Sequence, residues 1–193
     1  MANKPNKVKF GLKNVHYALL TTGEAGEITY ATPVPIPGAV NLNLPPQGDT
    51  TTFYADNTAY YVAVANNGYQ GDLEIALIPD SFSKDVLKET LDETDKVMVE
   101  NANVETAPFA LLFEFAGDQH AVRHVLYNCT AARPNVSGAT TTNTKEPTTA
   151  SLTVTAAPLS DGKVKAKTTA ETPEAIYNGW YKSVWQPSEA GDS

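Results

Sequence analysis

Alternating apolar and polar positions dominate this sequence and predict a chain built mainly of β-strands. In a strand, successive side chains point to opposite faces, so every second residue shares one face. The four apolar residues at odd positions from Phe109 to Phe115 follow this rule. A turn at 117–119 precedes a second apolar stretch at 121–129, so the two stretches predict a β-hairpin.

Further strands are predicted on both sides of this hairpin. Alternation from Tyr60 to Val64 is followed by a turn and a second apolar set from Leu73 to Leu77. Residues 151–156 also alternate, and the dipeptide Asp161-Gly162 is typical of a tight hairpin turn leading into 163–167.

The alternation changes phase within the stretch 8–20, at Lys13-Asn14. A β-bulge shifts the phase by one residue, and a strand that passes from one environment to another shows the same pattern. The two interpretations are compatible, because a bulge is how a strand is redirected. The apolar set is Val8, Phe10 and Leu12 before the break, and Val15, Tyr17 and Leu19 after it.

Two helices are predicted among the strands. The first covers about 80–92, begins after Pro79, and carries an apolar face that includes Phe82, Val86, Leu87 and Leu91. A second, short helix is predicted after Pro173, since proline suits the first helical position.

Prolines at alternate positions mark the stretch 32–38. Proline has no backbone N–H, so Pro33, Pro35 and Pro37 leave one edge of an extended segment without donors. We expect an edge strand or an extended arm here.

Length and composition suit one globular domain over 1–193, with a basic arm at about 1–12 and a short C-terminal segment at about 173–193. The net charge is −8, which argues against nucleic-acid binding by a basic surface. The charge is uneven: residues 1–20 hold four lysines and no acid, whereas 80–105 hold eight acids and three lysines. The basic arm of one copy and the acidic body of another can attract each other head to tail. A solvated terminus beside a solvated helix would give the same distribution of charge. A hydroxyl-rich stretch at 137–151 predicts a flexible loop or a threonine-rich strand.

No motif for catalysis, cofactor binding or metal binding is present in the sequence. Cys129 and His124 are five residues apart on a predicted strand, an odd spacing that places them on opposite faces and excludes a dyad. We therefore expect neither an enzyme nor a cofactor. The sequence has no stretch of 18 apolar residues and no apolar region near Met1, so we expect no membrane span and no signal peptide.

Several whole segments of the chain carry a family pattern. They are VKFGLKNVHYALL, TPVPIPGAVNLNL, FYADN, NNGYQGDLEIALIPDSF, and FALLFEFAGD followed by RHVLYNCTAARP. Together they resemble the major tail protein of long, non-contractile-tailed phages that infect Gram-positive bacteria, and the resemblance runs from Val8 to about Trp185.

This resemblance implies a β-sandwich or barrel-like tail-tube protomer with one flanking helix and extended arms. It implies hexameric rings that stack into the tail tube, the conduit for DNA ejection, in a virion tail made in the host cytoplasm. The implied partners are further copies of the chain and the tape measure, tail terminator and distal tail proteins, with DNA passing unbound. The chain is too short for the C-terminal Ig-like domain of some family members.

The resemblance also suggests roles for particular residues. Expected contacts between subunits or rings are Val8, Phe10, Leu12, Lys13, Pro33, Pro35 and Pro37. Thr153 and Thr155 are expected to face the lumen, because they alternate with Leu152 and Val154. Lys163, Lys165 and Lys167 argue against a lumen that is poor in positive charge, because they share one strand face. We expect that face to meet acids of a neighbour or to lie outside the tube.

A surface β-sandwich that binds carbohydrate or cell wall is the alternative function. Aromatic side chains can form a platform for sugar rings. The candidates are Tyr54, Tyr60, Tyr61, Tyr69, Trp180 and Trp185.

The N-terminal arm gives the first prediction. If Val8, Phe10 and Leu12 are buried against a neighbour, deletion of residues 2–12 should leave a folded monomer that assembles poorly. Circular dichroism and negative-stain microscopy measure the two properties. An unchanged yield of assemblies would contradict the prediction, and an unfolded product would assign the segment to the protomer core.

Overall fold

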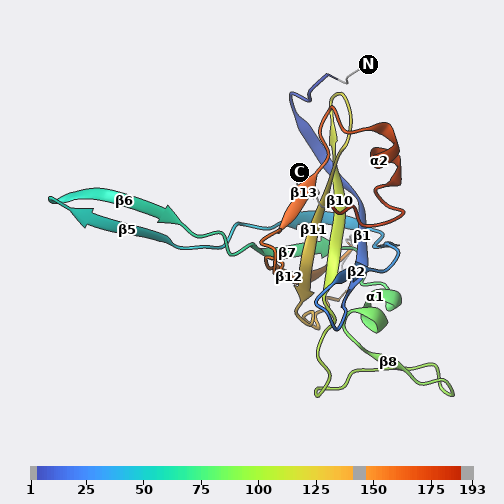
Figure 1. Cartoon of the computed structure of the whole chain (residues 1–193). Coiled ribbons are helices and arrows are strands. Elements are labelled where there is room, and N and C mark those ends of the chain that lie inside the picture. The colour runs from blue at the N-terminus through green and yellow to red at the C-terminus, as the bar shows by residue number, and fades with distance from the viewer. Residues whose placement is uncertain (1–3, 141–146, 188–193) are drawn as a thin grey trace.

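The most apolar part of the chain forms a hairpin that is buried on both faces. In the computed structural model, which describes residues 4–140 and 147–187, β10 (Phe109–Gly117) and β11 (Val122–Ala131) pair antiparallel, as the sequence predicts. Phe109 and Leu111 enter one core, whereas Ala110 and Leu112 enter a second core on the opposite face. The hairpin is therefore the central layer of the fold (Figure 1).

A large antiparallel sheet grows outward from this hairpin, and the mainly β prediction is confirmed, with 44% strand and 7% helix. Among the described residues, the main sheet has nine strands in the order β2-β1-β10-β11-β12-β7-β4, with β3 on β1 and β13 on β11. Its other strands are β1 (Lys9–Thr22), β2 (Ile28–Tyr30), β3 (Val34–Pro35), β4 (Ala39–Asn43), β7 (Tyr69–Ile75), β12 (Ala150–Ala156) and β13 (Lys165–Lys167). The separate elements are β5 (Thr50–Ala55), β6 (Thr58–Val64), β8 (Thr90–Leu91), β9 (Met98–Val99), α1 (Asp80–Asp85) and α2 (Glu174–Gly179).

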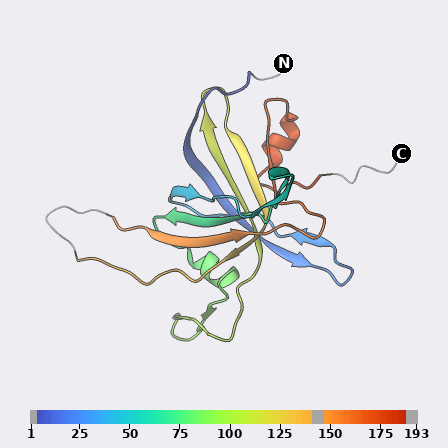
Figure 2. The same cartoon turned by 90° about the vertical axis from the view of Figure 1, so that its left-hand side faces the viewer.

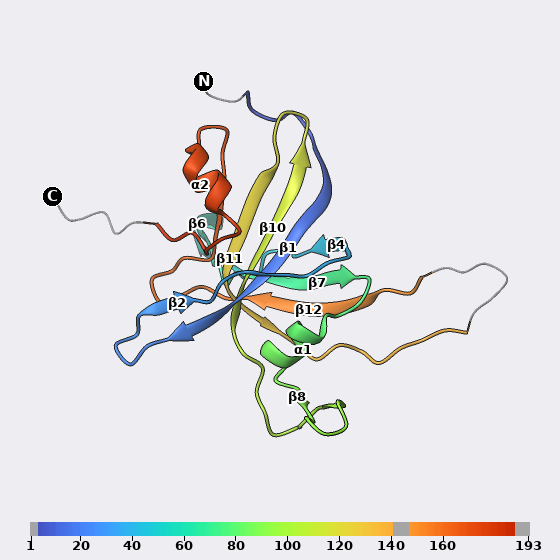
Figure 3. The same ribbon diagram turned by 90° about the vertical axis from the view of Figure 1, so that its right-hand side faces the viewer.

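The sheet bends so that β12, β7 and β4 run across β1, β10 and β11 (Figure 3). Side chains from both halves meet in the first core, including Tyr17 of β1, Leu73 of β7 and Leu152 of β12. Helix α1 closes this core with Phe82, whose ring packs edge to face on Phe109 at 5.6 Å between centroids. The first core therefore lies between the two halves of the bent sheet and is closed by α1.

The C-terminal segment covers the other face of the sheet. Trp180 and Val184 are buried against Ala18, Leu112 and Tyr127 in the second core. Helix α2 begins directly after Pro173, as predicted, and lies on this side of the sheet (Figure 2). The segment therefore belongs to the folded body as far as Pro187.

The phase break in β1 is a β-bulge. The pairing with β10 shifts register between Lys13 and His16, and Asn14 has a left-handed φ of 52°. Because of the bulge, Leu12 packs on the same core as Val15 and Tyr17.

The first helix is shorter than predicted. It ends at Asp85 rather than near 92, and Lys88 has a φ of 61°, which an α-helix does not accommodate. Leu87 still reaches the core, but Leu91 lies in the short strand β8. The helix ends once its apolar side chains have reached the core. The helical periodicity beyond residue 87 therefore does not correspond to a helix.

The turn at Asp161-Gly162 also differs from its predicted role. Gly162 has a φ of 81° and its N–H donates to Leu159 O, so a tight turn is present. However, β12 and β13 do not pair with each other, because each pairs with β11, at Cys129–Ala131 and His124–Leu126 respectively. Residues 141–146 of the hydroxyl-rich stretch lie outside the described residues.

The proline-rich stretch forms an edge strand, one of the two predicted outcomes. Strand β3 pairs with β1, and Ile36 N–H donates to Val15 O at 2.7 Å. The prolines leave the outer edge without donors. No helix of the described residues is long and apolar enough to cross a membrane.

Candidate functional site

A long hairpin projects from the body and is the most unusual surface of the molecule. Strands β5 and β6 pair only with each other and extend far to one side of the main sheet (Figure 1). Asp56 and Asn57 form the tip with φ values of 51° and 58°. Both residue types tolerate this conformation, which a two-residue hairpin turn of type I′ requires.

The hairpin carries large apolar side chains that no residue of 4–140 or 147–187 covers. Its exposed residues include Tyr60 at 72% and Val64 at 73% of full exposure. A two-stranded ribbon alone in water is at best marginally stable. Contiguous apolar patches on a protein surface are typical of interaction sites. The full exposed apolar set on the hairpin is Phe53, Tyr54, Tyr60, Tyr61, Val62 and Val64.

A polar face lies on the outside of the bent sheet, opposite the first core. Thr153 Oγ1 donates to Asp72 Oδ1 at 2.8 Å, and Thr149 Oγ1 donates to the Glu74 carboxylate. Asn41 and Asn43 of β4 pair in register with Glu74 and Asp72. The cross-strand register groups the following side chains on this face, none of which is basic: Asn41, Asn43, Gln70, Asp72, Glu74, Ser151, Thr153 and Thr155.

The predicted contact residues occupy different positions in the protomer. Val8 and Phe10 are 51% and 61% exposed, whereas Leu12 packs partly against the first core. Lys13 is exposed on β1. Pro35 and Pro37 are exposed, but Pro33 is buried. The structure therefore leaves Val8, Phe10, Lys13, Pro35 and Pro37 accessible and uses Leu12 and Pro33 within the protomer.

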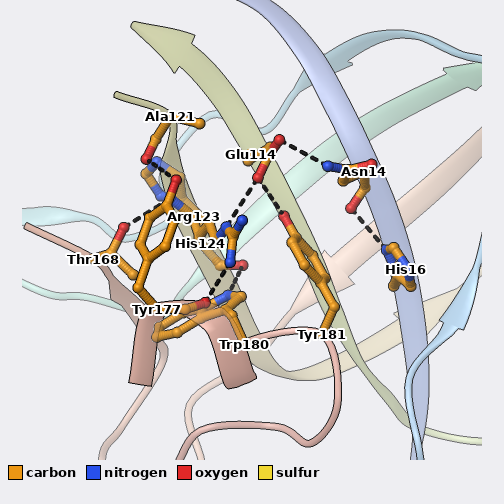
Figure 4. A network of polar contacts seen from close by, with 10 residues as sticks. All are labelled: Asn14, His16, Glu114, Ala121, Arg123, His124, Thr168, Tyr177, Trp180 and Tyr181. Atoms are coloured by element: carbon orange, nitrogen blue, oxygen red, sulfur yellow. Dashed lines mark hydrogen bonds and ion pairs between the residues drawn. The ribbon is translucent and has the colours of Figure 1, made fainter. Parts of the chain in front are cut away.

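A buried carboxylate anchors the bulge of β1. Glu114 is 6% exposed and accepts hydrogen bonds from Asn14 Nδ2 at 2.8 Å, Arg123 Nε at 3.1 Å and the Tyr181 hydroxyl at 3.2 Å (Figure 4). Burial, followed by the nearby Glu114 charge, raises the pKa of Tyr181, so its hydroxyl remains a donor. A buried charge needs such partners, because desolvation is otherwise costly. The cluster is a structural device that has no nucleophile.

The same arginine holds the C-terminal segment in place. Arg123 donates to Tyr177 O, and its guanidinium lies 3.8 Å from the centroid of the Tyr177 ring. Trp180 Nε1 donates to His124 O at 3.3 Å. These contacts fix α2 on the second face (Figure 4).

The aromatic residues proposed for sugar stacking do not form one platform. Tyr54, Tyr60 and Tyr61 are on the hairpin, whereas Trp180 is 3% exposed in the second core and stacks on Trp185 at 6.1 Å. Tyr69 contacts Lys165. The hairpin tyrosines are thus separated from the tryptophans.

Cys129 and His124 share a face of the sheet, so the expectation that they lie on opposite faces is wrong. A register shift between Phe109 and Leu111 changes the phase of β11, and Leu126 and Cys129 both enter the first core. Cys129 is fully buried, and burial raises the pKa of its thiol to about 12, which makes it an inert core residue. Within the described residues, no cluster of histidine, cysteine and acidic side chains has the geometry of a metal site.

No protein-family model matches the sequence, and no curated protein matches it. One solved structure is similar. It is the cryo-EM structure of the anti-feeding prophage cap, the AFP tube terminating cap, with a TM-score of 0.41 and 11% sequence identity. The match covers 86% of this chain and 96% of the cap chain.

Stability should depend on the protonation of His124. Burial, followed by the charges of Lys167, Lys165 and Lys9, lowers its pKa from 6.5 to about 4. Between these values the unfolded chain binds a proton that the folded chain does not, so His124 destabilises the fold as the pH falls from 6.5 towards 4. In urea titrations, a His124→Gln variant should lose less stability over this range than the wild type. Parallel slopes for the two proteins would contradict the assignment.

Proposed function

We propose that the chain is a structural virion protein that assembles with copies of itself into stacked rings, forming a phage tail tube. The observation that carries the proposal is the projecting hairpin, an apolar ribbon that the described part of the chain leaves exposed and that a second copy could cover. The resemblance of the sequence to major tail proteins supports a second copy as that partner. It also supports a ring of six subunits.

The energetics favour burial of the hairpin in an assembly. Fully burying one large apolar side chain contributes about 1.5–3 kcal/mol, and the hairpin presents several of them. In a closed ring each subunit both supplies and receives the same contact. A modest gain for each subunit is therefore repeated around the whole ring.

The polar face suits the wall of a conduit for DNA. Carboxylates repel phosphates, and hydroxyls add no positive charge. Repeated lysine contacts would instead hold the DNA by counterion release. Asp72, Glu74, Thr153 and Thr155 are therefore assigned to the lumen. Lys165 and Lys167 support this orientation, because they pair with Leu126 and His124 on the core side of the sheet rather than on the polar face. Lys163 is ion-paired with Asp161.

In this proposal the protein functions in the virion tail, where it binds further copies of itself and the tape measure, terminator and distal tail proteins. DNA passes through the lumen during ejection and is not bound. The carbohydrate-binding alternative requires the hairpin tyrosines to act without the tryptophans, and it leaves the apolar hairpin residues without a role.

Polar substitutions on the hairpin should separate folding from assembly. In the triple variant Tyr60→Ser, Tyr61→Ser and Val62→Thr, the body should remain folded, because these residues contact neither core. The amount of rings and tubes seen by negative-stain microscopy should fall more than about tenfold, since about 1.4 kcal/mol corresponds to a factor of ten.

The matched control is Thr50→Ser, Thr51→Ser and Thr58→Ser, which changes the same hairpin but removes only one methyl group at each position. It should assemble like the wild type. Tubes formed by the tyrosine variant in normal yield would contradict the proposed role of the hairpin.

An assembled ring also tests the lumen assignment. Cryo-EM of wild-type tubes should show Asp72, Glu74, Thr153 and Thr155 on the inner wall, which should carry net negative charge. An inner wall lined by Lys165 and Lys167, with net positive charge, would refute the lumen assignment and leave the tube assignment intact.

A further inference from the structure

A basic, aromatic pocket opens at one end of the first core. Its volume is about 340 Å³, and its lining includes Phe113, Phe115, Tyr69, Lys9 and Lys165. Lys9 Nζ lies 4.9 Å from the centroid of the Phe115 ring, and Lys165 Nζ lies 4.3 Å from that of Tyr69. The rings hold the ammonium groups at the pocket mouth.

The positive charge of this pocket is uncompensated by the described part of the chain. None of Lys9, Lys165 and Lys167 forms an ion pair with another described residue, and all three side chains are exposed. His124 stacks on Phe113 at 5.1 Å beside these lysines, and its pKa is lowered first by burial and then by their positive charges. Such a pocket is complementary to carboxylates.

A second surface, separate from this pocket, is acidic. Residues 88–107 leave the body as an excursion that contains β8 and β9, and they hold six acids and two lysines. Asp92 Oδ1 accepts the N–H groups of Thr94 and Asp95, which fixes a tight acidic turn. Two exposed valines, Val97 and Val99, follow this turn.

The acidic excursion lies beyond one end of the central hairpin, whereas the basic pocket lies beside it, where Lys165 and Lys167 of β13 pair with residues 124–126 of β11. The excursion leads into Phe109 at one end of β10, whereas Lys9 pairs with Gly117 at the other end. Figure 1 shows the excursion at the bottom of the molecule and the N-terminal strand at the top. One copy cannot bring them together, but two copies placed head to tail can.

We propose that the acidic excursion of one copy binds the basic pocket of the next copy along the tube axis, with the carboxylates at 92–95 facing Lys9, Lys165 and Lys167. This inference rests on the proposed stacking of rings and names the surfaces that meet. A head-to-tail contact directed along the tube axis does not close into a ring, so it can repeat from one ring to the next.

The pairing also gives direction to the stack. Acid against acid or lysine against lysine is repulsive, so rings cannot stack in opposite orientations. Exposed Val8 and Phe10 flank Lys9 on the basic side, and Val97 and Val99 lie beside the acidic turn. These apolar residues contribute burial next to the charges, which makes the contact less sensitive to salt than isolated surface pairs.

Charge reversal on each side tests the proposal. The variants Lys165→Glu/Lys167→Glu and Glu93→Lys/Asp95→Lys should each form rings but reduce tube yield at least tenfold. The variant that combines all four changes should recover tubes, because both signs are exchanged. A mixture of the two double variants should also recover tubes of alternating rings. The control Lys84→Glu/Lys182→Glu should keep normal tube yield.

The outcomes separate this inference from the proposed function. Normal tubes from both double variants, or absent tubes from the four-fold variant and the mixture, would overturn the inference. Failure of the wild type to form rings or tubes would instead overturn the proposed function.

Deuterium exchange at the His124 ring provides a measurement on wild-type protein. Docked carboxylates should raise the His124 pKa in tubes relative to monomers, and an equal pKa in both would count against the contact.

Discussion

Burial of the β10–β11 hairpin on both faces is the constraint from which the rest of the structure follows. A strand with large apolar residues on both sides needs two covers. The bent sheet and α1 supply one cover, and the segment that contains Trp180 and Val184 supplies the other. The buried Glu114, held by Asn14, Arg123 and Tyr181, connects these layers at the bulge of β1.

The β5–β6 hairpin receives no such cover from the described part of the chain. Its apolar side chains remain exposed, and burial against another chain would remove this area from water. Charge is divided as well, with exposed lysines beside the central hairpin and an acidic excursion beyond one end of it. The cores are thus completed within the chain, whereas the apolar hairpin, the basic pocket and the acidic excursion stay exposed.

The sequence predicted the elements with strong alternation. The β10–β11 hairpin, the edge strand at the prolines and α2 after Pro173 all appear where the pattern places them. Errors arose where bulges change the phase. The shift near Leu111 brings His124 and Cys129 to one face, and no residue type in β11 predicts this shift. The end of α1 depends on Lys88 adopting positive φ, a tertiary effect that periodicity does not show.

The projecting hairpin was the most important surface that sequence reasoning missed. Its signal was present in FYADNTAYYV, where Asp56-Asn57 separates two aromatic, strand-forming stretches. The stretch from Tyr60 was recognised as a strand, but its partner was not. Even with the pairing known, periodicity cannot show that a hairpin leaves the body, because exposure of both faces is a property of the whole fold.

Hydrogen exchange across residues 50–64 tests the central claim most directly. In the monomer, the ladder between β5 and β6 lacks tertiary support, so its amides should exchange much faster than those of β10 and β11. In assembled tubes the same amides should become strongly protected, while protection in β10 stays the same. Equal protection of the hairpin in monomers and tubes would contradict the account.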